Sequence, residues 1–399
     1  MMCHERLVRR WLSNSSRLIS KTTRFGHCLI AADFDGDGYD DLAIGMPGED
    51  LSGCDFVTCY EDVDAGAVRV LYGGSGSGLS GAGTQFWTQE SSRTDLVEER
   101  DYFGFSLAAG DFNGDGYSDL AVTAWGEGVG GAVTGAGAVS IIGGSAARLS
   151  NRATAGQFWH QDKAGVSDIA ESGDCFGCSL AAGDFNGDGY DDLAVGASGE
   201  NLPPLDRGMD AGAVHVLYGS PHWLNLDSTI HQFWHQSVPD VQDRIEAYDN
   251  FGASLTVGDF NRDGFDDLAI GITGEDVDTL VQGTVSNAGA VAVLHGSAIG
   301  LSATVVPDQF WHQARTGVED LPEESDNFGF SLAAGDFNGD GIDDLAAGVP
   351  QEDPSSINGT IVDAGAVHVT YGSLSGLNAM TILDQFWTQI IVLLPMPGG

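Results

Sequence analysis

The apolar positions of this chain fall into short runs that recur five times in the same order. The copies begin at Phe-Gly pairs whose aromatic residues are Phe25, Phe103, Phe176, Phe251 and Phe328. Each copy carries four apolar stretches; in the last copy these are "FGFSLAAGD", "DDLAAG", "AGAVHVTYG" and "DQFWTQ". All four have the length of a strand and lie between Gly-rich segments. Each copy therefore predicts four β-strands.

The repeat length decides the fold class. An aspartate follows each Phe by eight residues, so the unit is 73 to 78 residues long, counted between Asp33, Asp111, Asp184, Asp259 and Asp336. No segment keeps a 3.6-residue period, and 58 glycines separate the apolar runs. Repeated four-stranded units of this kind are typical of β-propeller blades. We predict an all-β propeller of four-stranded blades over residues 25–389, which either closes with five blades or is part of a larger ring.

The ends of the chain fall outside this pattern. Residues 1–24 are rich in Arg and Ser and contain one acidic residue. They resemble an organelle transit peptide in composition, and we expect a disordered or non-native segment. Residues 390–399 are expected to form a short tail. Its apolar run "IIVLLP" is far too short to span a bilayer, so no membrane insertion is expected.

Each copy has a nine-residue acidic loop between its first and second predicted strands, as in "DFNGDGYDD" at 184–192. Alternate residues of a tight loop can turn their oxygens inward, and a backbone carbonyl at position 7 can add another ligand. This pattern suits Ca²⁺, and we predict about five calcium sites, one in each repeat. The predicted ligands occupy positions 1, 3, 5, 7 and 9 of the loops: Asp33, Asp35, Asp37, Tyr39 and Asp41; Asp111, Asn113, Asp115, Tyr117 and Asp119; Asp184, Asn186, Asp188, Tyr190 and Asp192; Asp259, Asn261, Asp263, Phe265 and Asp267; Asp336, Asn338, Asp340, Ile342 and Asp344.

Comparison of the five loops supports this assignment. Positions 1, 5, 6 and 9 do not change, whereas position 4 includes Arg262 and position 8 includes Ser118. The variable positions are expected to point outward. An EF-hand is excluded because position 12 is apolar in every copy and strands flank the loop. The alternative is an Asp-Asn-Gly turn whose side chains cap their own backbone.

The Phe-Gly pair, the aspartate loop and the following "DLAIG" together resemble the FG-GAP repeat of the integrin α-subunit propeller. The resemblance covers residues 25–389, although the terminal Gly-Ala-Pro is imperfect, for example Gly45-Met46-Pro47. It implies calcium binding, an adhesion or recognition role and an extracellular or cell-surface location. Integrin propellers have seven blades and only some of them bind calcium, so the resemblance describes the blade rather than the receptor.

Charge excludes several partners. The chain has 16 basic and 58 acidic residues and a formal net charge of −42, so its surface repels nucleic acid and anionic membranes. Six cysteines are too few for a disulfide framework. Cys54 and Cys59 lie in one acidic loop and can pair. Cys175 and Cys178 are expected to be unbridged, because an extended chain would hold their Cα atoms about 10 Å apart.

Three functions stay open at this point. The first is a binding module for a protein or glycan, whose ligand lies on the face opposite the calcium loops. The loops there differ in length and content, as in 47–64 and 237–250. The second is a propeller hydrolase, such as a glycosidase or a phospholipase-associated domain; the fivefold repetition of the obvious carboxylates favours a scaffold and a protein that is not an enzyme. The third is a structural module of a larger extracellular assembly. Asn14 and Asn358 begin glycan-acceptor triplets. The ligand and the oligomeric state stay undetermined.

Overall fold

The computed structural model describes residues 23–54, 59–76, 78–92, 97–131, 133–151, 157–203, 209–225, 231–356 and 359–389. Within these ranges the protein is all-β, with five four-stranded antiparallel sheets. The helices there are α2 (Gln89–Ser92) and a 3-10 turn at Val129–Gly131, and none is long and apolar enough to cross a bilayer. Each sequence repeat forms one sheet, so the predicted fold of repeated four-stranded blades is confirmed.

The strands of each blade lie side by side in chain order. Blade 1 consists of β1 (Leu29–Ala32), β2 (Asp41–Met46), β5 (Ala67–Tyr72) and β6 (Ser80–Trp87). Blade 2 consists of β7 (Phe103–Gly110), β8 (Asp119–Ala124), β9 (Ala138–Ile142) and β10 (Phe158–Trp159). Blade 3 consists of β11 (Phe176–Gly183), β12 (Asp192–Ala197), β13 (Ala213–Leu217) and β14 (Gln232–Trp234). Blade 4 consists of β15 (Phe251–Gly258), β16 (Asp267–Ile272), β19 (Ala290–Leu294) and β20 (Gln309–Trp311). Blade 5 consists of β21 (Ser331–Gly335), β22 (Asp344–Val349), β25 (Ala366–Thr370) and β26 (Gln385–Thr388).

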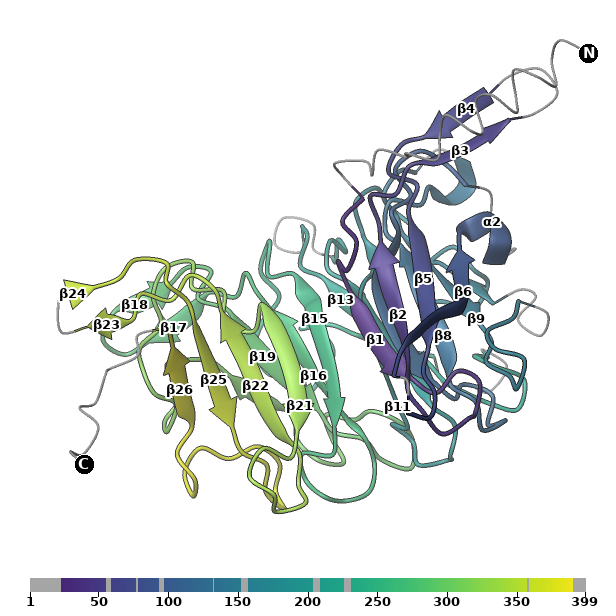
Figure 1. The fold of residues 1–399 in the computed structure, drawn as a ribbon. Coiled ribbons are helices and arrows are strands. Elements are labelled where there is room, and N and C mark those ends of the chain that lie inside the picture. The colour runs from purple at the N-terminus through teal and green to yellow at the C-terminus, as the bar shows by residue number, and fades with distance from the viewer. Residues whose placement is uncertain are drawn as a thin grey trace, which may run out of the picture.

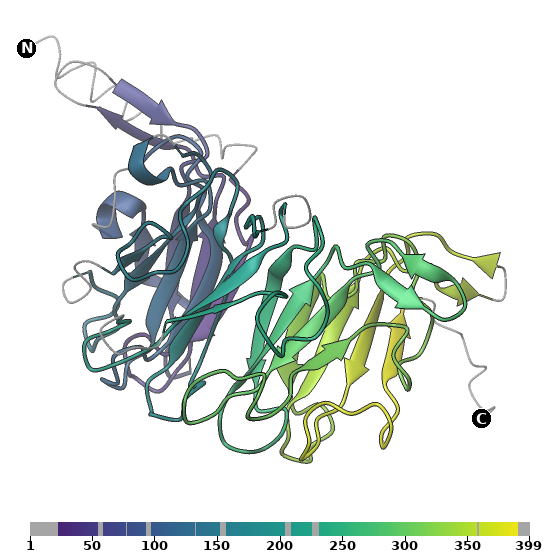
Figure 2. The same cartoon turned by 180° about the vertical axis from the view of Figure 1, so that it is seen from behind.

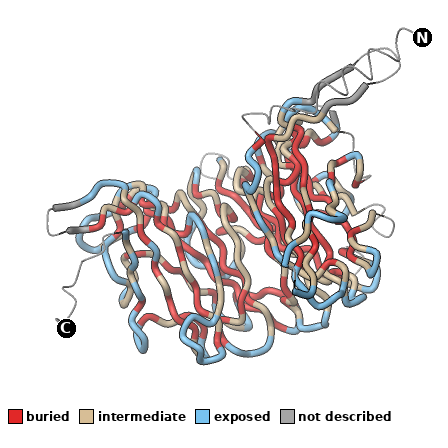
Figure 3. Tube along the Cα trace, viewed as in Figure 1, coloured by how far each residue is buried: buried red, intermediate tan, exposed pale blue. Residues whose placement is uncertain are grey.

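Burial explains the apolar patterns of the strands. Every residue of β8, β12 and β16 is buried, because these second strands lie between neighbouring blades and contact apolar side chains on both faces. Continuous apolar runs are typical of such strands. The fourth strand of blade 1, β6, has only one buried residue and carries Ser, Gly and Ala in its first half. Figure 3 shows the buried residues along the centre of the blades and the exposed ones at their edges.

The two edges of the blades carry different connections. The aspartate loops join first and second strands, so they lie with the turns between third and fourth strands at one edge, which we term the aspartate edge. The opposite edge, termed the hairpin edge, carries the connections between second and third strands. Three of these contain two-stranded hairpins: β3 (Leu51–Cys54) with β4 (Cys59–Asp62), β17 (Val277–Thr279) with β18 (Gly283–Val285), and β23 (Ser355–Ser356) with β24 (Gly359–Thr360). They project from the upper side in Figure 1.

The blades follow one another along an open arc. Consecutive blades pack through their first strands, β1 on β7, β7 on β11, β11 on β15 and β15 on β21. Figure 1 shows blades 1 and 5 at the two ends of this arc, and Figure 2 shows blade 3 between them from behind. Leu29 of blade 1 and Trp387 of blade 5 are 58% and 60% exposed. The structure thus places the first and last blades at open ends, and ring closure is not observed.

The Phe-Gly pair joins each blade to the one before it. The aromatic side chain is buried in four copies, and its backbone N–H donates to an alanine carbonyl of the preceding blade at 2.8 to 2.9 Å. These pairs are Phe103 with Ala65, Phe176 with Ala136, Phe251 with Ala211 and Phe328 with Ala288. Phe25, in the first blade that the structure describes, is 61% exposed. At the other end, Gly365 of blade 5 borders an open cavity of about 480 Å³.

A glycine makes this close junction possible. Gly212 has φ +82°, and a Cβ atom there would lie 2.3 Å from the carbonyl oxygen of Phe251. Gly283, at the tip of a hairpin, has φ +80° and no atom within 4 Å of the corresponding position. Both glycines therefore have a left-handed backbone, but only Gly212 also lacks space for a side chain.

We expect Gly212→Ala to destabilise the protein by about 2 kcal/mol more than Gly283→Ala. Both variants force alanine into a left-handed conformation, and only the first adds a clash with the backbone of the next blade. Urea unfolding of the two variants measures the difference. Equal losses would show that the junction has room to adjust.

The expectation for Cys175 and Cys178 was wrong. The two form a disulfide, and their Cα atoms are 5.4 Å apart. The chain is not extended there, because Cys175 has φ +61° and its carbonyl accepts a hydrogen bond from the N–H of Cys178 at 2.8 Å. A bulge in the pairing of β11 with β12 lies between Phe176 and Ser179 and includes Cys178. The backbone register places Cys54 opposite Cys59, and Cys28 is a free thiol.

Candidate metal centres

The five aspartate loops connect the first and second strands of their blades, where the sequence predicts them. In blade 3 the strands end at the pair Gly183 and Asp192, and the other blades have the same register. Position 1 of each loop accepts main-chain hydrogen bonds with both carboxylate oxygens. Asp184 accepts from the N–H groups of Asp188 and Gly189 at 3.1 and 2.9 Å. Position 5 accepts from the N–H of position 7, as Asp188 does from Tyr190 at 3.1 Å.

These hydrogen bonds form the self-capping turn that the sequence analysis named as the alternative to a metal site. These hydrogen bonds leave the carboxylate oxygens able to bind a metal ion, because each oxygen has a second lone pair. In blade 1, ligand oxygens of Asp33, Asp35 and Asp37 lie within 4.8 Å of one another. Oδ1 of Asp35 is buried and has no hydrogen-bond partner. An oxygen-only donor set of this kind fits a hard divalent cation.

Position 9 is buried in all five blades. One oxygen of Asp192 accepts from the N–H of Phe185 in the same loop at 3.1 Å, and the other accepts from the N–H of Gly219 at 2.8 Å. Gly219 lies in the turn between the third and fourth strands. Burial raises the pKa of Asp119 and of Asp192 to about 8. The sequence predicted position 9 only as a metal ligand; the structure shows that this residue ties the loop to the neighbouring turn of its own blade.

Positions 4 and 8 turn away from their own loops, but they do not simply point outward into solvent as expected. Position 8 accepts the N–H of position 1 in the preceding blade: Asp191 from Asp111 at 2.7 Å, Asp266 from Asp184 at 2.8 Å and Asp343 from Asp259 at 3.1 Å. At position 4, a Cβ on Gly114 would lie 2.4 Å from the ring of Tyr190. Both positions therefore help to join adjacent blades.

We expect Asp266→Ala to cost about 1 to 2 kcal/mol of unfolding free energy, because it removes the acceptor of a partly buried N–H in the preceding blade. Asp40→Ala is the matched control. Asp40 occupies the same loop position in blade 1, the first blade that the structure describes, and it is exposed. Chemical denaturation compares the two. A similar loss from Asp40→Ala would mean that position 8 acts within its own loop.

A second set of acidic residues lies at the hairpin edge, and the sequence interpretation missed it. Each junction between blades carries the pattern Asp-x-x-Glu-x-x-Asp-x-Phe-Gly, as in 168–177 and 243–252. The recurrence of this spacing in four copies is the signal that reveals it. The last aspartate of the pattern is buried, and its Oδ2 accepts the N–H of the glutamate, as Asp249 does from Glu246 at 2.7 Å. A further buried glutamate, Glu275 at this junction, follows the second strand.

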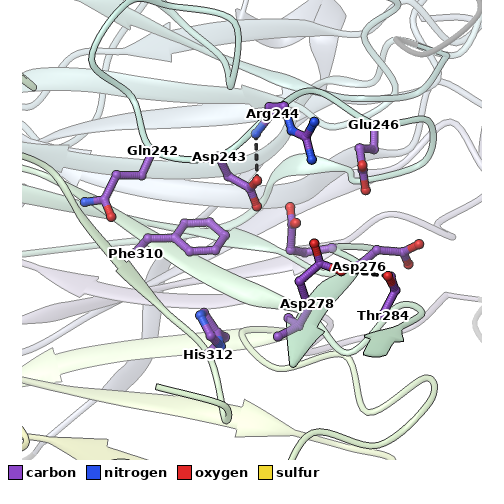
Figure 4. A pocket seen from close by; sticks show the side chains of 11 residues that line it. Gln242, Asp243, Arg244, Glu246, Asp276, Asp278, Thr284, Phe310 and His312 are labelled. Atoms are coloured by element: carbon purple, nitrogen blue, oxygen red, sulfur yellow. Dashed lines mark hydrogen bonds between the residues drawn. The ribbon is translucent and has the colours of Figure 1, made fainter. Parts of the chain in front are cut away.

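A cavity of about 420 Å³ opens beside this set at the junction of blades 3 and 4. Figure 4 shows residues of the linker 242–246, of the β17–β18 hairpin and of the end of β20 around it. Its carboxylates belong to Asp243, Glu246, Glu275, Asp276 and Asp278. The basic groups in its lining are Arg244 and the imidazole of His312. Burial, followed by Asp243, raises the pKa of Glu275 to about 11. Glu275 is therefore protonated at neutral pH, and the negative charge of the cavity comes from Asp243, Glu246, Asp276 and Asp278.

Sequence comparison agrees with the repeat structure. The chain matches the FG-GAP repeat at residues 25–71, 103–142, 176–217, 251–294 and 328–370. It is 32% identical to integrin alpha-PS2 of Drosophila melanogaster over 273 residues, which are 67% of this chain and 16% of that protein. It is 30% identical to phosphatidylinositol-glycan-specific phospholipase D of Rattus norvegicus over 44% of this chain and 18% of that protein. This chain thus spans less than a fifth of either relative.

A solved structure that this one resembles is a rhamnogalacturonan lyase of Bacillus licheniformis. The likeness covers 92% of this chain and 67% of that one, with 13% sequence identity and a TM-score of 0.34.

Proposed function

The chain belongs to the FG-GAP repeat family, and on this premise we propose that residues 25–389 form a calcium-loaded recognition module that binds a protein ligand at its hairpin edge. Calcium would be held in the aspartate loops by the oxygens of positions 1, 3, 5 and 9 and by the carbonyl of position 7. The cluster of Asp33, Asp35 and Asp37, with its unpartnered buried oxygen, supports this assignment. Bound calcium would neutralise the loops and fix them between two strands.

The observation that carries the recognition role is the contrast between the two edges. The aspartate edge repeats one loop five times, whereas the hairpin edge carries connections that differ from blade to blade. Leu280 and Val281 lie fully exposed at the tip of the β17–β18 hairpin. The same hairpin contributes Asp278 and Thr284 to the acidic cavity. An apolar tip beside a charged cavity is a surface that a ligand can cover.

Charge indicates which ligand fits. Among the described residues that line the cavity, five carry a carboxylate and Arg244 carries a guanidinium. A basic side chain of a protein ligand would be attracted into it, while apolar ligand residues would cover Leu280 and Val281. The relatives named integrin alpha subunits support an adhesion role and an extracellular or cell-surface location. The glycan-acceptor residues Asn14 and Asn358 and the terminal segments 1–22 and 390–399 lie outside the described residues.

The test is capture of secreted and cell-surface proteins on the immobilised calcium-loaded chain, followed by direct binding of each purified candidate. We expect Leu280→Asp to weaken binding at least tenfold, because it places a charge at the centre of the proposed contact. Leu374→Asp is the matched control, since Leu374 is also an exposed apolar turn residue but lies at the aspartate edge. Equal effects of the two variants would contradict a ligand at the hairpin edge, and turnover of the captured molecule would favour the hydrolase alternative.

A further inference from the structure

The junction of blades 2 and 3 contains a compact group of carboxylates that the aspartate loops do not include. Ligand oxygens of Glu171, Asp174 and Glu200 lie within 4.8 Å of one another. Asp174 precedes β11, and Glu200 follows β12, so both belong to the hairpin edge of blade 3. Asp174 is 0% exposed and Glu200 is 1% exposed, whereas Glu171 is exposed to solvent. Two buried carboxylates, those of Asp174 and Glu200, therefore lie beside the solvent-exposed carboxylate of Glu171.

The group contains buried oxygens that no protein donor satisfies. Oδ2 of Asp174 accepts the N–H of Glu171, and Oε2 of Glu200 accepts a hydrogen bond from Nε2 of Gln161. The other oxygens, Oδ1 of Asp174 and Oε1 of Glu200, are buried and have no partner, and neither has Oε1 of Gln161. Buried polar atoms normally have partners, so unpartnered oxygens on two carboxylates of one cluster, with a third on the amide that contacts Glu200, indicate a missing ligand.

No basic side chain compensates this charge. Within the described ranges, none of the ion pairs includes Glu171, Asp174 or Glu200. The side chain of Asp168 instead contacts Glu200, which adds a fourth carboxylate. Burial and these acidic neighbours raise the pKa of Asp174 to about 7 and that of Glu200 to about 9. Carboxylates this close must share protons or bind a cation.

We propose that Asp168, Glu171, Asp174, Glu200 and the amide oxygen of Gln161 form a second type of divalent-cation site, at the hairpin edge between blades 2 and 3. Five oxygen donors of which four are carboxylates suit Ca²⁺, which takes about six to eight oxygens. Gln161 follows the last strand of blade 2, so the ion joins two blades. A loop calcium, by contrast, would be held within one blade.

The equivalent junction of blades 3 and 4 has the same acids but a different neighbour. There Arg244 follows Asp243, where the first junction has Ile169 after Asp168. Arg244 acts on Glu246 by lowering its pKa, against the larger raising effect of burial. The group there opens into the 420 Å³ cavity of Figure 4. Among the described residues, its acids do not form a cluster like that of Glu171, Asp174 and Glu200. A fixed positive charge and a wider space make that junction a weaker cation site than the junction of blades 2 and 3.

The experiment counts calcium ions bound to the full chain by native mass spectrometry and by calorimetric titration with Ca²⁺ alone. Glu200→Gln and Glu171→Gln should each lose one equivalent relative to the unmodified chain. Glu171 is exposed, so its variant keeps the buried packing and remains informative if Glu200→Gln folds poorly. Glu319→Gln, which changes an exposed acid outside the group, should lose none.

Asp188→Asn separates this site from the aspartate loops. It should remove the loop ion of blade 3 and leave the hairpin-edge ion, and the double variant with Glu171→Gln should lose two equivalents. The proposal is overturned if Glu171→Gln and Glu200→Gln bind as many ions as the unmodified chain, because the carboxylates would then share protons only. Loss of the loop ions alone would leave this site standing, so the two types of site are tested separately.

Discussion

Removal of calcium with a chelator is expected to lower the unfolding free energy of the protein by about 7 kcal/mol. A ligand present at about ten times its dissociation constant stabilises the folded state by about 1.4 kcal/mol per site, and five independent loop sites contribute in sum. This equals the whole net stability of many domains. The physical reason is electrostatic: without the ion, three aspartates such as Asp33, Asp35 and Asp37 face one another within 4.8 Å.

Thermal melting at several free calcium concentrations measures this effect. The melting temperature should rise with the logarithm of calcium concentration, and magnesium at the same concentration should restore less, because it demands a more rigid octahedral geometry. Sodium chloride at matched ionic strength controls for general screening of the −42 net charge. Identical melting curves with and without chelator would refute calcium sites in the loops.

Truncation of one interblade aromatic residue should have the next largest effect. We expect Phe251→Ala to destabilise the protein by about 3 to 5 kcal/mol, because Phe251 is fully buried between blades 3 and 4 and its loss leaves a cavity. The matched control is Phe25→Ala, in which the same residue of the repeat is 61% exposed. We expect it to change stability by less than about 0.5 kcal/mol.

Denaturant unfolding of the two variants provides the comparison, with circular dichroism to follow the loss of β-structure. The control also tests the shape of the ring. If Phe25→Ala costs as much as Phe251→Ala, Phe25 is seated against another blade in solution, and the open cavity beside Gly365 is the site that it would fill.

Local patterns in the sequence were sufficient for the blade and its aspartate loop. Positions 1 and 5 of each loop bond to atoms within five residues, as Asp184 does with Gly189. Such contacts follow from a short stretch of chain, and they form the self-capping turn that the sequence offered as the alternative to a metal site. The predicted strands were confirmed for the same reason, since alternation and run length depend on neighbouring positions.

Contacts between distant residues were not predictable in this way. Asp266 accepts a hydrogen bond from the N–H of Asp184, 82 residues earlier, and no local sequence pattern near either residue indicates this contact. Cys175 and Cys178 were misjudged because a left-handed residue and a strand bulge bring them together. The Asp-x-x-Glu-x-x-Asp pattern was visible as spacing in the sequence. The carboxylate cluster, however, forms only because Glu200 lies beside this pattern in the fold and Gln161 donates a hydrogen bond to Glu200.

The sequence by itself determined the repeated blade, the order of its strands, the place of the acidic loops and the sign of the surface charge, because each of these depends on residues close together in the chain. Only the tertiary structure decided that the blades form an open arc, that variable loop positions join neighbouring blades, and that buried carboxylates gather at the hairpin edge. These features arise where segments about 30 to 80 residues apart pack against each other, and packing of that kind depends on the whole fold rather than on local pattern.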